Sequence, residues 1–513
     1  MTAPSAALNA ARRARDLDEL SRGRPVDVLV VGGGSTGAGI ALDAACRGLS
    51  VVLAEKHDLA FGTSRWSSKL IHGGLRYLAS GQLGIARESA VERGILLTRT
   101  APHLVRALPQ LVPLTPAVSR ANAALVGAGF LAGDLLRATA GTPGHVLPPP
   151  RRVSATEVHR HAPTIRTDQL RGGLLSWDGQ AHDDARLVVA IARTAARHGA
   201  RILTRCAAEQ VTGRGAVLRD QLTGQAISLD ARVVINATGV WAGQVAPGVA
   251  LRPSRGTHLV LAQDSFGGLA AGLTVPVPGE HNRFVFALPA PDRRVYVGLT
   301  DEPAPGPVPD IPHATPAEID FLLDTINAVL RTPLSHADVL GTFSGLRPLL
   351  DTGTGRTADL SRRHQVHTAP DGLVTVVGGK LTTYRRMAED ALDAALRAAG
   401  IPHRPCRTHR LPLVGAATRA QLAAIAAPRR LVRRYGTEAP AVLAQAQGDP
   451  RLLEPITEDT ATTTAELLFA IRHEGALDEA DLLDRRTRIG LVPAARTRAL
   501  PAARAALDHA LPH

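Results

Sequence analysis

Apolar runs and helical spacing alternate near the start of the chain. Val26–Val31 (VDVLVV) is a nearly continuous run of β-branched residues, which is typical of a strand buried on both faces. It leads into GGGSTGAGIALDAACRG, where glycines give way to an alanine-rich pattern with helical spacing. The next apolar run, Leu49–Lys56 (LSVVLAEK), indicates a second strand. The order strand, helix, strand predicts a βαβ unit.

The same combination of strand and glycine recurs far along the chain. NATG (Asn236–Gly239) and VVGGK (Val376–Lys380) each follow an apolar run and would return the chain to the same sheet edge. Between residues 251 and 350, RFVFALP and RVYVGLTD indicate a mostly antiparallel sheet. After about residue 400 the segments are rich in Ala, Arg and Leu, as in helices. We therefore predict an α/β protein with a Rossmann-like domain, an antiparallel-sheet domain and a helical C-terminal domain.

The Pro-rich residues 102–150 end in VLPPPRR and predict an insertion over the first domain, outside its sheet. The predicted division of the chain is an N-terminal extension (1–25), the nucleotide-binding domain in three parts (26–100, 181–250 and 351–400), an insertion with a substrate-domain segment (101–180), a substrate-binding domain (251–350) and a helical domain (401–513).

Composition narrows the classes of function. The 513 residues carry a formal charge of +13, and among 59 basic residues only three are Lys. Aromatic residues make up 3% and do not interleave with basic ones, so an Arg-rich solvated surface is favoured over nucleic-acid binding. Three distant cysteines without metal spacing fit a reducing cytosol and predict neither a disulfide framework nor a metal site.

Two apolar or terminal segments bear on membranes. The N-terminus has charges where a signal peptide needs an apolar run. The best apolar stretch, Ala123–Leu136, is too short to span a bilayer and contains Asp134. We expect a protein without transmembrane segments, which could still rest on a membrane surface.

The first glycine-rich turn predicts a dinucleotide site. Gly32, Gly34 and Gly37 form G-x-G-x-x-G between a strand and a helix, where glycines allow a tight turn, close approach of a pyrophosphate and close packing. The helix N-terminus favours the anion. Glu55 ends the second strand, where a carboxylate can hold a ribose. The two later glycine turns favour a flavin over a nicotinamide, because a helix N-terminus facing the ring would stabilise its reduced, negative form.

The stretch Ser67–Leu78 (SSKLIHGGLRYL) mixes Lys, His, paired glycines, Arg and Tyr in a way that packing alone does not require. Together with GGGSTGAGIALDAACRGLSVVLAEK, RGTHLVL, GLRPLL and GGKLTTYR, it closely resembles the FAD-dependent glycerol-3-phosphate dehydrogenases. The resemblance continues through RLPLVGA, RYGTEAPAV and AIRHEGALDEADLLDRRTR, whereas residues 120–150 match poorly. It implies an amine-oxidase-like flavoprotein with an added helical domain. The implied reaction oxidises sn-glycerol 3-phosphate to dihydroxyacetone phosphate and passes the electrons to a membrane quinone.

The resemblance also implies roles for residues within these motifs. Implied FAD contacts are Gly32, Gly34, Gly37, Glu55, Ser67, Ser68, Lys69, Gly73, Gly74, Gly239 and Gly379. The implied substrate pocket contains Arg76, Tyr77, Arg347 and Arg362, and the implied catalytic residues are His258, Lys380 and Arg347. Arg363 stands beside Arg362, so the position of that arginine in the pocket is less well defined.

The residue types suit this chemistry. Forked arginines bind the oxygens of a phosphate dianion in pairs. A secondary alcohol that gives up hydride must also lose its hydroxyl proton, and a histidine such as His258 can accept it near neutral pH. Lys380 at a helix start could polarise the alcohol oxygen or support the negative charge of the flavin.

Other functions stay open at this stage. An oxidase that returns electrons to oxygen would share the substrate motifs, and a related flavoprotein could act on another hydroxy acid. A non-enzymatic protein that binds anionic surfaces would use the positive charge but would have no use for GLRPL or GGKLTTYR. We expect a cytoplasmic protein, peripheral on the inner face of the cell membrane, and a homo-oligomer is compatible with the sequence.

Overall fold

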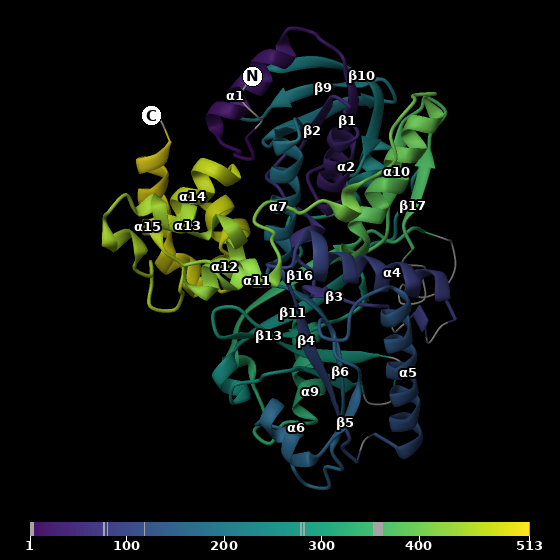
Figure 1. Ribbon diagram of the computed structural model, residues 1–513, viewed down its shortest axis with the longest axis vertical. Coiled ribbons are helices and arrows are strands. Elements are labelled where there is room, and N and C mark those ends of the chain that lie inside the picture. The colour runs from purple at the N-terminus through teal and green to yellow at the C-terminus, as the bar shows by residue number, and fades with distance from the viewer. Residues whose placement is uncertain are drawn as a thin grey trace.

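The computed structural model describes residues 5–74, 77–78, 81–116, 118–277, 280, 283–351 and 363–511. Two sheets are stacked one above the other in the view of Figure 1, and the C-terminal helices lie to one side of their junction. The upper sheet contains the N-terminal strands, and the lower sheet contains most of the middle of the chain. None of the described helices is long and apolar enough to cross a bilayer.

The upper sheet is built from segments distant in the sequence. Its described strands are β1 (Val26–Val31), β2 (Val51–Ala54), β7 (Arg201–Leu203), β8 (Cys206–Thr212), β9 (Gly215–Asp220), β10 (Ala226–Asn236), β17 (Gln365–Thr368) and β18 (Val374–Val377). The main order is β17-β18-β10-β1-β2-β7, and β18, β10, β1, β2 and β7 are parallel neighbours. The predicted Rossmann-like domain assembled from separated segments is confirmed.

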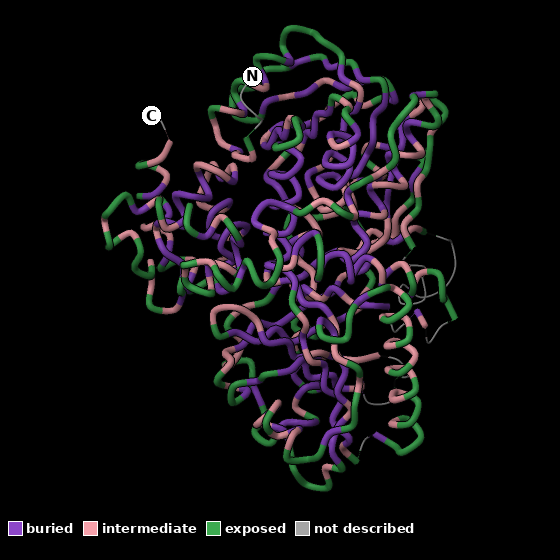
Figure 2. The backbone as a smooth tube through the Cα atoms, viewed as in Figure 1, coloured by how far each residue is buried: buried purple, intermediate pink, exposed green. Residues whose placement is uncertain are grey.

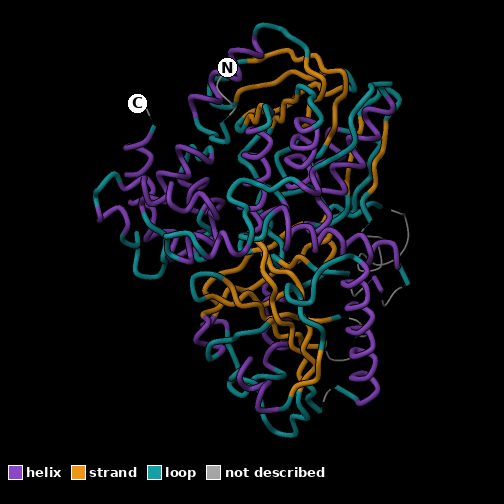
Figure 3. The backbone as a smooth tube through the Cα atoms, in the orientation of Figure 1, coloured by secondary structure: helices purple, strands orange, loops and turns teal. Residues whose placement is uncertain are grey.

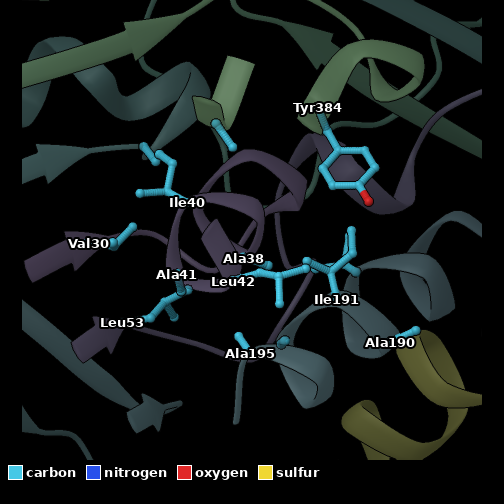
Figure 4. Packing of buried hydrophobic residues seen from close by; sticks show 14 of the residues in the cluster. Val30, Ala38, Ile40, Ala41, Leu42, Leu53, Ala190, Ile191, Ala195 and Tyr384 are labelled. Carbon is cyan, nitrogen blue, oxygen red and sulfur yellow. The ribbon is translucent and has the colours of Figure 1, made fainter. Parts of the chain in front are cut away.

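Apolar side chains on both faces hold this sheet in place. Helices α2 (Ser35–Cys46), α7 (Asp184–Arg197) and α10 (Tyr384–Ala398) pack together over one face. Figure 4 shows Val30 and Leu53 from the sheet on one side of α2, near Ile40 and Ala41, and Ile191 of α7 on its other side, near Leu42. On the other face, Leu17 and Leu20 of α1 (Ala10–Ser21) pack with residues of β1. Burial on both faces explains the continuous apolar runs of the strands.

The lower sheet is mostly antiparallel, as predicted. Its described strands are β3 (Leu70–Ile71), β4 (Val105–Pro113), β5 (Arg151–Val153), β6 (Gly173–Ala181), β11 (Ser254–Ala262), β12 (Gly272–Pro276), β13 (Phe284–Ala290), β14 (Arg294–Gly298), β15 (Glu302–Pro303) and β16 (Val339–Arg347). The main order is β15-β11-β14-β13-β12-β4-β6-β3, with β16 beside β11 and β5 beside β6. Helix α9 (Pro316–Asn327) packs against β11 and β13, and α6 (Ala155–His161) packs near β4.

The structure corrects one part of the prediction for residues 102–150, the insertion over the first domain, whereas their position outside the first sheet and within the substrate-domain segment agrees with it. Instead of an insertion over the first domain, β4 pairs with β6 along its whole length and joins the lower sheet. Pro109 and Pro113 are compatible with this strand because β12 pairs only with Gln110 and Leu111, which leaves the prolines without a neighbour on that side. Helix α4 (Leu83–Ile95) precedes β4, and helix α5 (Arg120–Thr139) follows it.

The C-terminal region is helical, as predicted (Figure 3). Its described α-helices are α11 (Arg419–Ala423), α12 (Arg429–Tyr435), α13 (Ala439–Leu443), α14 (Thr464–Glu474) and α15 (Pro493–Ala510). Figure 2 shows buried backbone where these helices meet the rest of the molecule. At this junction Asp58 accepts hydrogen bonds from Arg485 (2.7 Å) and Arg486 (2.7 and 2.8 Å). All three residues are buried, so ion pairs as well as apolar contacts join the two parts of the chain.

Candidate active site

The glycine turn after β1 has the geometry that the motif predicts. Gly32 has φ +108°, and a Cβ atom there would lie 2.7 Å from the carbonyl oxygen of Ala237. A Cβ atom on Gly37 would collide with the carbonyl oxygen of Gly32. Gly34 begins α2 and provides no side-chain cap. The turn is therefore tight, and the start of α2 presents its amide groups and its positive dipole end.

Glu55 lies beside this turn at the end of β2. Its carboxylate accepts hydrogen bonds from the backbone N–H of Gly33 (2.6 Å) and of His57 (2.8 Å). Burial raises the pKa of Glu55, and these two N–H groups act in the opposite direction. Glu55 thus fixes the glycine turn against the following loop. Its predicted contact with a ribose stays a prediction.

The two later glycine turns come to the same place as the first. Asn236 pairs with Val31 at the end of β10, and β18 lies next to β10. Gly239 has φ +62°, and nothing lies within 4 Å of the position of an added Cβ atom. Gly379 has φ +71°, and a Cβ atom there would collide with Met387. The expected convergence of three strand–glycine units on one sheet edge is confirmed.

Several atoms around these turns fit a bound cofactor. No described atom lies within 4 Å of the position of a Cβ atom on Gly239, so a ligand can approach its backbone closely. The Thr382 hydroxyl, three residues after Gly379, is buried without a hydrogen-bond partner in the described structure, and so is Nδ1 of His258. Because buried polar atoms are normally bonded, these orphaned atoms indicate that a polar ligand completes the site.

The segment SSKLIHGG is held by an aspartate that the motif analysis did not identify. Asp184, at the start of α7, accepts hydrogen bonds from the N–H (3.0 Å) and hydroxyl (2.8 Å) of Ser67. It also forms an ion pair with the Lys69 ammonium at 3.1 Å. Burial lowers the pKa of Lys69 to about 8, although Asp184 opposes this effect. The side chains of Ser67 and Lys69 therefore serve to shape this segment.

His258 occupies a buried position on β11. Its Nε2 atom lies 2.8 Å from the Ser68 hydroxyl, and its ring stacks on Phe343 of β16 at a centroid distance of 4.6 Å. Only 2% of its surface is exposed. Burial lowers the pKa of His258 well below its usual range, and the positive charges of Lys69 and Arg347 add to this effect. The imidazole is therefore neutral at physiological pH, the form that accepts a proton.

This depressed pKa predicts how stability depends on pH. The unfolded chain binds a proton at His258 near pH 6.5, but the folded protein does not, so the free energy of unfolding should fall as the pH drops below 6.5. The contribution of one such histidine is about 1.4 kcal/mol at pH 5.5. Urea unfolding measured at pH 7.5 and at pH 5.5 should show that the free energy of unfolding decreases less between the two pH values for His258→Gln than for the unmodified protein. Equal losses would mean that folded His258 is protonated.

Arg347 ends β16 on the same side of the sheet as His258. It donates to the Ser254 hydroxyl (3.0 Å), to Asp301 (3.2 Å) and to the carbonyl oxygen of Thr300 (3.0 Å). Its guanidinium covers Gly256, where a Cβ atom would collide with it. Ser254, Gly256 and His258 alternate along β11 and so share one face. The predicted histidine and arginine are thus brought together.

Lys380 and Tyr77 also meet, although 303 residues separate them in the sequence. The Lys380 ammonium lies 4.4 Å from the centre of the Tyr77 ring and donates to the Ser89 hydroxyl of α4. Tyr77 itself is buried. Because cations are attracted to the faces of aromatic rings, this contact fixes the lysine beside the glycine pair Gly378 and Gly379.

The remaining predicted residues are either described by the structure, as Gly73 and Gly74 are, or lie outside the described residues. Gly73 donates its N–H to Asp178 (3.0 Å), and Arg93 covers it, whereas Gly74 adopts φ +83° against α4. Arg76 and Arg362 lie outside the described residues. The sequence analysis missed the described residues that position the site from outside the motifs' assigned positions: Asp178, Asp184, Ser89, Ser254, Asp301 and Phe343. The acidic stretch SWDGQAHDDARL, which spans the end of β6 and the start of α7, was the available signal for Asp178 and Asp184.

Comparisons with known proteins agree with this geometry. Residues 27–385 match the family model described as FAD dependent oxidoreductase, and residues 406–511 match the C-terminal domain of alpha-glycerophosphate oxidase. Glycerol-3-phosphate dehydrogenase 1 of Mycobacterium tuberculosis is 58% identical over 507 residues, which cover 98% of each chain. Glycerol-3-phosphate dehydrogenase 2 of the same organism is 38% identical over 95% of this chain and 85% of its own.

Solved structures show the same architecture. The glycerol-3-phosphate dehydrogenase from Bacillus halodurans complexed with FAD superposes with a TM-score of 0.74 at 26% identity, covering 97% of this chain and 94% of its own. L-alpha-glycerophosphate oxidase from Mycoplasma pneumoniae with FAD bound superposes with a TM-score of 0.56 at 20% identity, covering 76% of this chain and 99% of its own. The second likeness concerns the fold alone.

The fold and the three glycine turns define a flavoprotein oxidoreductase whose cofactor is FAD. The similarity over nearly the whole chain then identifies a family within this class. It belongs to the FAD-dependent glycerol-3-phosphate dehydrogenase family.

Proposed function

We propose that the protein oxidises sn-glycerol 3-phosphate to dihydroxyacetone phosphate and passes the electrons to a membrane quinone. The observation that carries this proposal is the placement of a buried, neutral His258 and of Arg347 on one face of the lower sheet. A proton acceptor and a phosphate-binding fork are the two groups that a phosphorylated secondary alcohol requires. The names of the relatives that match over nearly the whole chain support the same substrate.

His258 is proposed as the acceptor of the hydroxyl proton. When bound, FAD supplies the hydride acceptor for the carbon that carries this hydroxyl. Ser68 holds Nε2 of the ring at 2.8 Å, and stacking on Phe343 fixes the ring plane. Nδ1 has no partner in the described structure and is therefore the nitrogen that we assign to the substrate hydroxyl.

Arg347 is proposed to bind the phosphate, together with Arg76, Arg362 and Tyr77. Asp301 and Ser254 hold the Arg347 guanidinium in a fixed plane, which suits the paired hydrogen bonds of a phosphate. Tyr77 links this pocket to Lys380 through the ring contact.

Lys380 is proposed to stabilise negative charge next to the cofactor, and the glycines to shape the cofactor site. The ammonium is fixed between the Tyr77 ring and Ser89, at the start of the short helix that leads into α10. The proposed FAD contacts are the glycine turns at Gly32, Gly34, Gly37, Gly73, Gly74, Gly239 and Gly379, with Glu55, Ser67, Ser68 and Lys69 supporting the segments that carry them.

The proposal also specifies the electron acceptor. A quinone is favoured over oxygen because the long matches are to proteins named dehydrogenases. We propose a cytoplasmic protein bound to the inner face of the membrane, where a quinone is available, and a homo-oligomeric state is compatible with the sequence.

One anaerobic experiment tests substrate and acceptor in sequence. Mixing the purified yellow protein with glycerol 3-phosphate in the absence of oxygen should bleach the flavin absorbance near-completely, because hydride transfer reduces the ring. Adding a water-soluble quinone should then restore the absorbance faster than adding oxygen. Failure to bleach would contradict the substrate, whereas faster restoration by oxygen would favour the oxidase alternative.

A further inference from the structure

A small internal cavity lies between helix α7 and the C-terminal helices, and its lining residues are not among those proposed to bind FAD or substrate. Its volume is about 10 Å³, which is room for one water molecule or one monatomic ion. Its wall combines residues of α7 with residues of α12 and the last residue of α14. The cavity therefore lies on the junction between the two parts of the chain.

Two arginines of this wall lie side by side although their charges repel each other. Arg186 of α7 and Arg434 of α12 both donate to the carbonyl oxygen of Arg486, Arg186 at 3.4 Å. Their guanidinium carbons lie 4.4 and 5.8 Å from the centre of the Tyr435 ring. Both side chains are buried, and a buried charge without an opposite charge nearby is strongly destabilising. The two arginines therefore need negative charge in their surroundings.

The carboxylates in and beside the cavity wall each bind one arginine. Each accepts two hydrogen bonds from a single guanidinium: Glu438 from Arg193 (2.6 and 2.8 Å), Glu466 from Arg430 (2.9 and 2.7 Å) and Glu474 from Arg186 (2.6 and 2.8 Å). Arg434 is the fourth guanidinium, and its Nε atom lies 3.9 Å from Glu466, beyond hydrogen-bonding distance. Four arginines and three glutamates leave one positive charge in excess among these groups.

Two neighbouring histidines respond to the same excess of positive charge. Burial lowers the pKa of His182, just before α7, well below its usual range, and the charges of four nearby arginines act in the same direction. Burial and the charge of Arg186 lower the pKa of His103, which lines the cavity, to about 3. Both rings are therefore neutral at physiological pH, and the electrostatic field around the cavity favours an anion.

The unpartnered polar atoms of the cavity wall are nitrogens. Nε of Arg186, Nε of Arg434 and Nδ1 of His103 are buried without a hydrogen-bond partner in the described structure. A guanidinium nitrogen can only donate a hydrogen bond. Among the described lining residues, no buried side-chain oxygen lacks a partner in this way. These donors fit an anion better than a water molecule, because water would leave the excess positive charge uncompensated.

We propose that the cavity between Arg186 and Arg434 binds a small monovalent anion, and that this anion is chloride. The ion accepts hydrogen bonds from the two Nε atoms and neutralises the charge in excess. The size of the cavity excludes a phosphate ester or a carboxylic acid as the ligand. Because the wall belongs to both parts of the chain, the ion joins α7 to α12 and stabilises their junction. This inference is independent of the proposed substrate and electron acceptor.

The test is thermal unfolding of the full-length holoprotein, followed by circular dichroism, in sodium chloride and in sodium gluconate at equal ionic strength. A ligand that binds only the folded state raises the melting temperature, so chloride should raise it by at least about 2 °C over gluconate. Arg434→Met removes the uncompensated charge and should abolish this rise. The matched control is Arg433→Met, which removes the same charge from the adjacent, exposed position outside the cavity wall and should keep the rise.

Crystals of the unmodified protein soaked in sodium bromide give a second measurement. Anomalous scattering should show a bromide ion between the guanidinium groups of Arg186 and Arg434. Equal melting temperatures in chloride and gluconate, or crystals without a bromide ion at this position, would overturn the proposal, and a water molecule would then fill the cavity. A chloride-dependent rise that Arg434→Met retains in full would overturn it as well. If Arg434→Met does not fold, the bromide position decides.

Discussion

Replacing His258 by alanine should lower the turnover of glycerol 3-phosphate by roughly 10²–10⁴-fold while FAD stays bound. This range is the typical contribution of a positioned general base. The ring is buried, neutral and held by Ser68 and Phe343, so its proton-accepting atom is fixed in place before the substrate binds. The measurement is the rate of flavin bleaching in a single anaerobic turnover, which isolates the chemical step from the reaction with the electron acceptor.

His103 offers a matched control for the loss of a buried histidine. It is 8% exposed, and burial lowers its pKa to about 3, but it packs against Gly415 at the junction with the C-terminal region. His103→Ala should keep most of the bleaching rate even if its melting temperature falls. If both variants bleach at similar rates, His258 is not the base, and Lys380 or a bound water becomes the next candidate.

Replacing Arg347 by alanine should weaken the binding of glycerol 3-phosphate by about ten- to a hundredfold. A hydrogen bond to a charged group contributes about 1.5–3 kcal/mol, and each 1.4 kcal/mol corresponds to a factor of ten in affinity. Arg347→Lys should recover only part of this loss, because an ammonium cannot make the paired contact of a guanidinium. The measurement is the concentration of glycerol 3-phosphate that half-saturates the rate of bleaching.

Two controls separate phosphate binding from a structural role. Glycerol lacks the phosphate, so it should be a poor substrate that is nearly indifferent to Arg347→Ala. Arg255 lies on the opposite face of β11 and pairs with Glu318 at 2.9 Å, so Arg255→Ala removes a nearby arginine without touching the proposed pocket. An equal loss for glycerol and glycerol 3-phosphate would show that Arg347 serves the cofactor or the fold instead.

The parts of the fold that depend on local pattern were predictable from the sequence. VDVLVV becomes β1 with the predicted bounds, and the helix after the first glycines begins at Ser35 because the tight turn ends there. The strand β4 was missed because its prolines resemble a loop, and only the pairing partner shows that they are tolerated. Pairing is a long-range property that one segment does not contain.

In the candidate site, too, the residues within local motifs were predictable, whereas their long-range partners were not. The motifs indicated Lys69, His258 and Lys380 and two of the residues that hold them, Ser68 and Tyr77, but not Asp184 or Ser89. Asp184 is 115 residues from Lys69, and Ser89 is 291 residues from Lys380. Such partners are ordinary acidic or hydroxyl residues that form no recognisable sequence motif. They become neighbours of the lysines only when the chain folds.

The buried ion pairs of Asp58 restrict the exchange of the two parts of the chain between related proteins during evolution. Residues 27–385 and 406–511 match separate family models, which suggests two exchangeable modules. Yet Asp58 in the first part accepts two hydrogen bonds from Arg486 in the second, and both residues are 1% exposed or less. A C-terminal part joined to a first part without this carboxylate would bury the Arg486 guanidinium without its ion-pair partner, at a cost of about 3–5 kcal/mol. The two halves are therefore matched to each other, and a recombination that separates them would need the aspartate and the arginine to travel together.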